Sequence, residues 1–231
     1  MSAERDRFLD RVRRAVAEGN RAGAAPALPA RGGVGYQGGG LDPVARFCAE
    51  LAAAGGQPHV VADGPAALAA VLALVRERGA RRVLFGAAPV FEGLDWAGAL
   101  RGAGVEVVAA AGAPNGAGRR EAFFAADLGL SGVDYLIAET GSVVVLSRPD
   151  QPRALSLLPP VHVAVARREQ LLPDLFDLFE GVPWAQRGGL PSGLSLVTGP
   201  SKTGDTELQL VTGVHGPGEL HVFLLAPPAV A

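Results

Sequence analysis

The fold is decided by the stretch Thr198-Gly-Pro-Ser-Lys-Thr-Gly-Asp-Thr-Glu207, with Gly213-Val-His-Gly-Pro217 shortly after it. The apolar run Leu194-Ser-Leu-Val197 before it is typical of a strand, and we expect a helix from about Asp205 to Thr212. A strand, a glycine-containing turn and a helix start direct backbone N–H groups and a helix dipole to one place, and such a place favours anions. The stretch therefore predicts a binding site for a carboxylate or a phosphate.

Several residues of this stretch are candidates to bind that anion, and Lys202 adds a full positive charge among them. The pattern is not a P-loop, because G-x-x-x-x-G-K-[ST] needs a glycine immediately before the lysine and Ser201 stands there. In the structural alternative, Thr203 or Asp205 only caps the helix and Lys202 is solvated. The predicted anion-binding residues are Gly199, Ser201, Lys202, Thr203 and Asp205.

Two further residues of the same region are candidates for catalysis. Glu207 is expected about one turn into the helix, where a carboxylate acts in catalysis or completes a capping box. His215 lies in a turn made by glycines and a proline, where its imidazole acts as a general acid or base or simply bonds a carbonyl. Both alternatives stay open for each residue.

The turn Glu139-Thr-Gly-Ser142 forms a second candidate site at the end of an expected strand. Ligands of α/β folds gather beyond the carboxyl ends of strands, and a glutamate there can act as a nucleophile or a base. We therefore predict Glu139 as catalytic and Thr140, Gly141 and Ser142 as substrate-binding, with a plain hairpin turn as the alternative. We expect this turn to lie beside the Ser201–Asp205 turn and to form one pocket with it.

These motifs resemble those of the lactate-utilisation protein C family, which carries the LUD domain. The resemblance rests on GPSKTGDTE, GVHGP, Ala138-Glu-Thr-Gly-Ser-Val143 and Leu158-Pro-Pro-Val-His-Val163, and it covers roughly the second half of the chain. It implies an α/β fold with a mixed, largely parallel sheet flanked by helices, similar to sugar isomerases and CoA-transferases (NagB/RpiA-like). It also implies a role in oxidising L-lactate to pyruvate beside iron–sulfur partner subunits, as a component of an L-lactate dehydrogenase complex.

The pattern of the chain agrees with such a fold. Residues 1–40 predict an amphipathic helix, Ala3 to Glu18, followed by an arm rich in glycine, alanine and proline. Residues 41–231 predict the α/β domain, because strands alternate with helices. The expected helices are Pro43–Ala54, Pro65–Arg78, Leu94–Arg101, Glu121–Asp127 and Gln170–Phe179. The expected strands are His59–Ala62, Arg82–Phe85, Val105–Ala109, Tyr135–Glu139, Ser142–Leu146, Val161–Ala166, Leu194–Thr198 and Leu220–Leu225.

Composition narrows the classes of partner and cofactor. The net charge of −2 argues against nucleic acid as a partner. The single cysteine, Cys48, cannot hold an iron–sulfur cluster, and the four scattered histidines make a zinc site improbable. No segment has the pattern of a signal peptide or a membrane span. We therefore expect a cytoplasmic protein that binds no metal or cofactor itself, with iron–sulfur clusters in partner subunits.

Three functions stay open on this basis. The first is a subunit of an L-lactate-oxidising system that binds the small carboxylate and acts with iron–sulfur proteins. The second is a stand-alone enzyme acting on an anionic acyl or phospho substrate. The third is a non-catalytic assembly or regulatory module. All three functions are compatible with a homo-oligomer.

Overall fold

The computed structural model describes residues 3–19, 38–111, 117–148, 151–182, 184, 191, 193–204 and 210–227. The chain consists of two compact units, Met1–Gly35 and Tyr36–Ala231. In the first unit the described element is helix α1 (Ala3–Gly19), which confirms the predicted N-terminal helix. The division predicted at residue 40 stays a prediction. Within the described residues, no helix combines the length and the apolar character needed to cross a bilayer.

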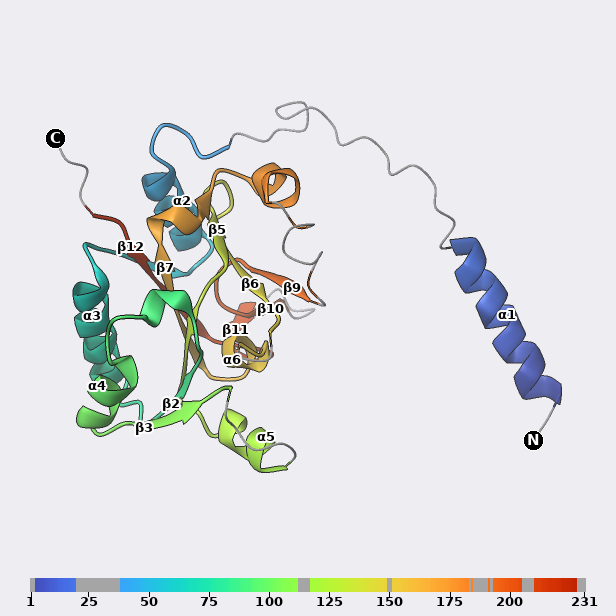
Figure 1. Cartoon of the computed structure of the whole chain (residues 1–231), viewed down its shortest axis with the longest axis horizontal. Coiled ribbons are helices and arrows are strands. Elements are labelled where there is room, and N and C mark those ends of the chain that lie inside the picture. The colour runs from blue at the N-terminus through green and yellow to red at the C-terminus, as the bar shows by residue number, and fades with distance from the viewer. Residues whose placement is uncertain are drawn as a thin grey trace. The chain divides into compact units, whose positions relative to one another are not determined.

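A six-stranded parallel sheet forms the centre of the second unit (Figure 1). Every neighbouring pair in it is parallel, as the alternation of helices and strands predicted. In spatial order the strands are β1 (Gln57–Val61), β12 (Glu219–Leu225), β7 (Val161–Arg167), β4 (Leu128–Gly132), β2 (Arg82–Phe85) and β3 (Glu106–Ala109).

A second sheet of four strands packs against one face of the first. It contains the predicted hairpin, in which two strands pair antiparallel, and so confirms a mixed architecture. Its strands are, in order, β8 (Leu171–Leu172), β5 (Tyr135–Ile137), β6 (Ser142–Leu146) and β9 (Leu194–Val197). Ala164 and Val222 of the first sheet pack with Val143 of the second and with Phe47 of helix α2 (Pro43–Ala53) in one buried core.

Helices cover the other face of the parallel sheet. Helices α3 (Gly64–Glu77) and α4 (Trp96–Gly102) bury Val71 and Trp96 against strand residues such as Val163. Two shorter helices, α5 (Ala117–Phe124) and α6 (Ala154–Leu157), lie instead on the face of the second sheet, where they contribute to a smaller core around Leu84. The remaining short turns are η1 (Pro89–Phe91), η2 (Arg168–Gln170) and η3 (Asp177–Gly181).

An aspartate caps each of two helices that have a proline in the first turn, α2 and α3. Asp42 Oδ1 accepts hydrogen bonds from the backbone N–H groups of Val44 and Ala45, at 3.0 and 3.1 Å. Asp63 accepts in the same way from Ala66 at 2.8 Å. These bonds satisfy N–H groups that the first helical turn leaves without a partner.

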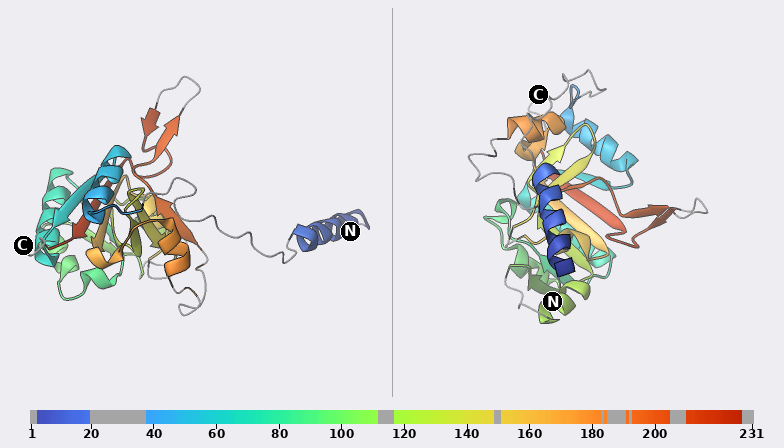
Figure 2. Two further views of the ribbon diagram at one scale, coloured as in Figure 1. Left: turned by 90° about the horizontal axis from the view of Figure 1, so that it is seen from above. Right: turned by 90° about the vertical axis from the view of Figure 1, so that its right-hand side faces the viewer.

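The predicted helix from Asp205 to Thr212 is wrong. The described residues on either side form an antiparallel pair, β10 (Lys202–Gly204) with β11 (Leu210–Thr212). Figure 2 shows this pair, in orange-red, projecting away from the two sheets in both views. The β-branched side chains of Thr203, Val211 and Thr212 favour a strand over a helix, and this preference outweighs the capping pattern.

Two other expectations need correction. The helix predicted over Gln170–Phe179 is replaced at its start by η2 and strand β8, and only the region after Pro173 turns helically. Strand β4, between β2 and β7, was not predicted, because its sequence Leu-Gly-Leu-Ser-Gly is typical of a turn. Its glycines have a packing reason: a Cβ on Gly129 would lie 2.2 Å from the carbonyl oxygen of Leu155, and one on Gly132 2.3 Å from the Cβ of Ala88.

A chain of polar side chains joins the edge of the parallel sheet to the end of α3. His59 Nε2 lies 3.1 Å from His221 Nδ1, and His221 Nε2 lies 3.0 Å from Glu219 Oε2. Arg78 Nε donates to the same Glu219 oxygen at 2.9 Å. His221 is buried, so this chain satisfies its two ring nitrogens inside the protein.

Candidate functional site

The turn Glu139–Ser142 lies next to Thr198 at one end of the β6–β9 pair. Val143 pairs with Val197, and the residues just beyond that pair are joined by a hydrogen bond of 2.6 Å between the hydroxyls of Ser142 and Thr198. The hydroxyl of Thr140 lies 2.7 Å from that of Ser142. The predicted single pocket is wrong, because residues Glu139–Ser142 line neither of the two pockets described below and Lys202–Gly204 form strand β10 instead of a turn.

The glycines of the two turns fit against the C-terminal end of α2. Gly141 has φ +63°, and a Cβ there would lie 2.2 Å from the backbone nitrogen of Leu51. Gly199 has φ +83°, and its Cβ would lie 2.5 Å from the carbonyl oxygen of Ala54. Both positions therefore need glycine for conformation and for space, whatever they bind.

Lys202 has a different neighbour from the one predicted. Its Nζ donates a hydrogen bond to the carbonyl oxygen of Ala54 at the C-terminal end of α2. Because Thr203 lies in a strand paired with Val211, no helix N-terminus adds positive charge at this place. The anion-binding role of Lys202 stays a prediction, now without the helix dipole as support.

Three other predicted residues lie away from the pockets or outside the description. Glu139 is half-buried, and its backbone N–H donates to the carbonyl of Pro173 at 3.0 Å. It lies in the turn after β5 of the four-stranded sheet, so the rule about carboxyl ends of the parallel sheet does not place it. Asp205 and Glu207 lie outside the described residues, and their predicted roles stay predictions.

A small pocket of about 270 Å³ brings together three of the predicted site residues, Gly199, Ser201 and His215. Backbone hydrogen bonds hold its walls: Ser201 N–H donates to Pro217 at 2.8 Å, and Gly213 N–H donates to Ser201 at 2.9 Å. The pocket lies at the amino ends of β7 and β12. Its other described lining residues are Ser156, Leu157, His162, Leu196, Val197, Thr198, Gly216, Pro217 and Leu220.

The polar groups of the small pocket suit a small anion. Hydroxyls come from Thr198 and Ser201, and imidazoles from His162 and His215, whereas the hydroxyl of Ser156 donates to the carbonyl of Arg153. No carboxylate is among the described residues that line it. Hydroxyl and imidazole groups donate hydrogen bonds to the oxygens of an anion, and no described negative charge repels it there.

His162 is the buried member of this set. It has no exposed surface, and its Nε2 lies 2.9 Å from the hydroxyl of Ser131. Burial lowers the pKa of His162 to about 4, so the ring is neutral near pH 7. The sequence predicted only the strand that contains it, Val161–Ala166, and the contact with Ser131 accounts for one of its two ring nitrogens.

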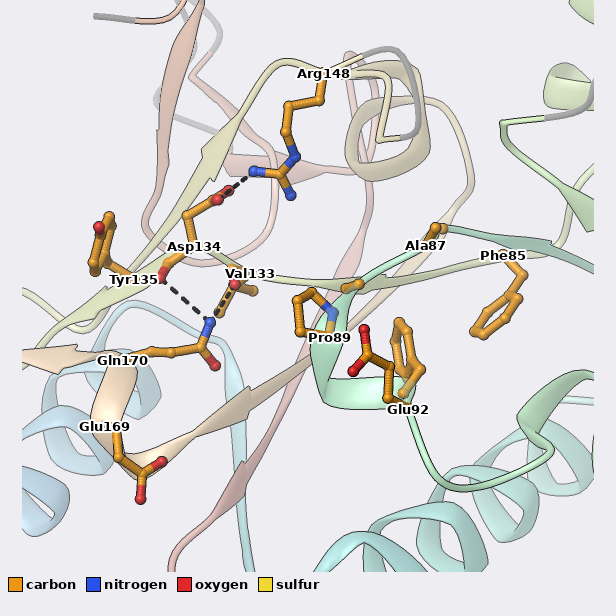
Figure 3. Close-up of a pocket in the computed structure, with 13 residues that line it drawn as sticks. Phe85, Ala87, Pro89, Glu92, Val133, Asp134, Tyr135, Arg148, Glu169 and Gln170 are labelled. Atoms are coloured by element: carbon orange, nitrogen blue, oxygen red, sulfur yellow. Dashed lines mark hydrogen bonds and ion pairs between the residues drawn. The ribbon is translucent and has the colours of Figure 1, made fainter. Parts of the chain in front are cut away.

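A large pocket of about 810 Å³ lies at the opposite end of β7, beyond the carboxyl ends of β2, β4 and β7 (Figure 3). The ion pair of Asp134 and Arg148 lies at one side of it, and Asp134 Oδ2 also accepts from the Leu146 N–H at 2.8 Å. Gln170 donates to the carbonyl of Val133 and accepts from the Arg167 N–H. These bonds hold Asp134, Arg148 and Gln170 in place in the pocket wall.

The charge of the large pocket suits an anion less well. Arg148 is already paired with Asp134, while the carboxylates of Glu92 and Glu169 line the pocket with no ionic or hydrogen-bond partner among the described residues. Arg167 approaches the rim, where it donates to the carbonyl of Pro89 at 3.1 Å. Sequence reasoning missed this pocket because it missed β4. The sequence did contain one signal for this pocket, the glycines at the ends of two buried strands, Gly86 and Gly132.

We expect Lys202→Met to lower the free energy of unfolding by about 0.5–1 kcal/mol, because a cation at a helix C-terminus stabilises the exposed carbonyls. Urea unfolding of the mutant and the wild type measures the difference. Lys202→Arg, which keeps the charge, should recover part of it. Equal stability of all three proteins would show that the bond to Ala54 contributes nothing.

Comparisons with known proteins agree with these motifs. The LUD domain family model matches residues 44–225. Lactate utilization protein C of Deinococcus radiodurans is 41% identical over 101 residues, which cover 43% of this chain and 47% of that protein. The protein of the same name from an Exiguobacterium species is 35% identical over 108 residues, 46% of this chain and 47% of that protein. These alignments span less than half of each relative.

A solved structure shares the fold. It is the crystal structure of a DUF162 family protein from Deinococcus radiodurans, with a TM-score of 0.54 and 24% identity over 79% of this chain and 95% of that one. Its similarity supports the architecture alone. The family model covers most of the second unit, including both candidate turns and both pockets. The chain belongs to the LUD domain family.

Proposed function

We propose that this protein is a component of L-lactate oxidation and that it binds the small carboxylate in the small pocket. The observation that carries the proposal is the lining of that pocket: two imidazoles and the hydroxyls of Thr198 and Ser201, with no carboxylate among the described lining residues. Its volume of about 270 Å³ accommodates an acid of a few heavy atoms. The names of the two aligned relatives supply lactate as the acid to test.

An iron–sulfur cluster does not fit the residues of this chain. Such a cluster is held by several cysteine thiolates, and the chain contains one cysteine. Cys48 is half-buried on α2, where burial first and the nearby Asp42 second raise the pKa of its thiol. We therefore assign iron–sulfur clusters to partner subunits, and this chain's part is to bind and orient the acid.

Ser201 and His215 are the groups of this chain placed for that part. They lie on two loops tied together by the Gly213–Ser201 and Ser201–Pro217 backbone bonds, so their separation is fixed by the fold. His215 is exposed, so its imidazole meets an acid at the mouth of the pocket. In the proposal, Ser201 and His215 bind the carboxylate of the acid.

Calorimetric titration of L-lactate and pyruvate tests the site. We expect wild-type protein to bind both in the millimolar to high-micromolar range and Ser201→Ala to bind at least about ten-fold more weakly, since a hydrogen bond to a charged group contributes about 1.5–3 kcal/mol. Ser195→Ala is the matched control, because Ser195 lies on β9 outside both pockets. Absence of binding to the wild type, or equal binding to Ser201→Ala, contradicts the site.

Purification of the tagged protein from its native cells tests the partners. We expect proteins containing iron–sulfur clusters to co-purify with it, with iron and acid-labile sulfide in the complex. The complex, assayed with an artificial electron acceptor, should oxidise L-lactate. Isolation of a catalytically active chain free of partners would instead favour a stand-alone enzyme.

A further inference from the structure

One buried nitrogen in the small pocket is left without a partner by the protein. His162 lies on β7 with no exposed surface and lines the pocket. Its Nε2 is held by the Ser131 hydroxyl at 2.9 Å, but its Nδ1 finds no hydrogen-bond partner in the described chain. A buried polar atom left unpaired is costly, so such an atom in a pocket wall points to a partner that comes from outside the chain.

The hydrogen-bond inventory indicates which tautomer the ring adopts. If Nε2 carried the proton, it would donate to Ser131, and both the buried Ser131 O–H and the lone pair of Nδ1 would remain unpaired. If the Ser131 hydroxyl donates to Nε2, the ring proton is on Nδ1, and only that N–H lacks a hydrogen-bond partner. The second arrangement satisfies more groups, so His162 presents an N–H donor to the pocket.

We infer that the Nδ1–H of His162 donates to the oxygen on carbon 2 of a short 2-hydroxy or 2-oxo acid, whose carboxylate lies toward Ser201 and His215. The identity of the acid rests on the proposed function. The position of the donor does not, because it follows from the Ser131 contact and from burial.

Burial decides this orientation of the acid. His162 is fully buried, Ser201 is half-buried, and His215 is exposed. One end of the pocket is therefore inside the protein, and the other end is open to solvent. A carboxylate loses far more by desolvation than a hydroxyl or a carbonyl does. The charged end therefore stays near the mouth, and the neutral oxygen meets the neutral donor inside.

This arrangement makes His162 a specificity-determining residue. Propionate has the carboxylate and the carbon chain of lactate and pyruvate but lacks the oxygen on carbon 2. It would leave the buried Nδ1–H unpaired, so wild-type protein should bind pyruvate at least about ten-fold more tightly than propionate.

Nitrogen-15 NMR of histidine-labelled wild-type protein tests the donor without a variant. We expect the His162 signals of the free protein to show the proton on Nδ1, and pyruvate to shift that N–H while propionate does not. A proton on Nε2 overturns the inference. A shift of equal size with propionate also overturns it, by assigning the donor to the carboxylate. So does an N–H bonded to water that no acid displaces.

Two variants test the consequence for specificity. His162→Met removes the donor at similar volume and should reduce the preference for pyruvate over propionate to near one. Ser131→Ala keeps the ring but frees its tautomer, and should lower the preference partly; it also serves if His162→Met fails to fold. Ser195→Ala should keep the full preference. An unchanged preference in both pocket variants overturns the inference.

The outcomes separate this inference from the proposed function. Lactate binding with unchanged His162 signals and unchanged specificity overturns the inference and leaves the function standing. Binding of pyruvate through the His162 N–H without any binding of lactate supports the inference and overturns lactate as the substrate. If no short acid binds the wild type, both are overturned.

Discussion

Gly141→Ala is expected to lower the free energy of unfolding by about 2–5 kcal/mol, the sum of two effects. The left-handed backbone conformation at φ +63° costs a residue with a Cβ roughly 1–2 kcal/mol. The added carbon would also lie 2.2 Å from the backbone nitrogen of Leu51. Because that atom belongs to helix α2 and no side chain can rotate away, the helix must shift, and overpacking of this kind costs about 1–3 kcal/mol.

Gly79→Ala is the matched control for this experiment. Gly79 has nearly the same backbone angle, φ +60°, but a Cβ there would meet nothing within 4 Å. It should therefore show the conformational cost alone. Urea unfolding of both mutants beside the wild type separates the two terms. If Gly141→Ala is no less stable than Gly79→Ala, the contact between this turn and α2 does not constrain the protein.

The second large effect is a loss of stability in acid that depends on His162. Its folded pKa of about 4 lies below the ordinary value of 6.5, so between these pH values the unfolded chain binds more protons than the folded one. The stability that a neutral His162 contributes is fully present above pH 6.5 and is lost as the pH falls toward 4. A pKa difference of this size corresponds to about 3 kcal/mol.

Two other groups, His59 and Glu219, also have lowered pKa values, and both therefore also make the folded protein less stable in acid. The pKa of His59 is lowered by burial first and by His221 second. The pKa of Glu219 is also lowered: burial acts to raise it, but the bonds from His221 and Arg78 outweigh burial. The His162 contribution is therefore measured as a difference: unfolding free energies of wild type and His162→Gln between pH 7.5 and 4 should converge by about 3 kcal/mol. His215→Gln, at an exposed histidine, is the control. Parallel curves for wild type and His162→Gln would contradict the prediction.

The sequence predicted the fold where local pattern and tertiary structure agree. The strand Arg82–Phe85 has the predicted bounds, and Asp42 caps α2 as expected. The prediction from sequence failed at β4, because glycines such as Gly129 and Gly132 are typical of turns. In the structure these glycines allow close contacts with other parts of the chain. A close contact between distant segments leaves no periodic trace in the sequence.

The site was predicted only in part, again because contacts between distant segments are not visible in the sequence. The motif residues Gly199, Ser201 and His215 do share a pocket, as neighbouring motifs suggested. The role of Lys202 could not be read, because its partner is the carbonyl of Ala54, far away in the sequence. His162 was recognised only as a strand residue, since neither its contact with Ser131 nor its position in the pocket wall follows from the valines beside it.

The position of β12 has a consequence for synthesis of the chain. Strand β1 pairs with β12 and with no other strand of the described sheets, so its inner edge stays open from the time Val61 is made until Glu219–Leu225 follow. At about 5–20 residues per second, this wait is on the order of 10 s or more. During that time β7 also exposes an unpaired edge. A nascent chain on the ribosome therefore carries the open edge of β1, and later that of β7 as well, until β12 pairs with both.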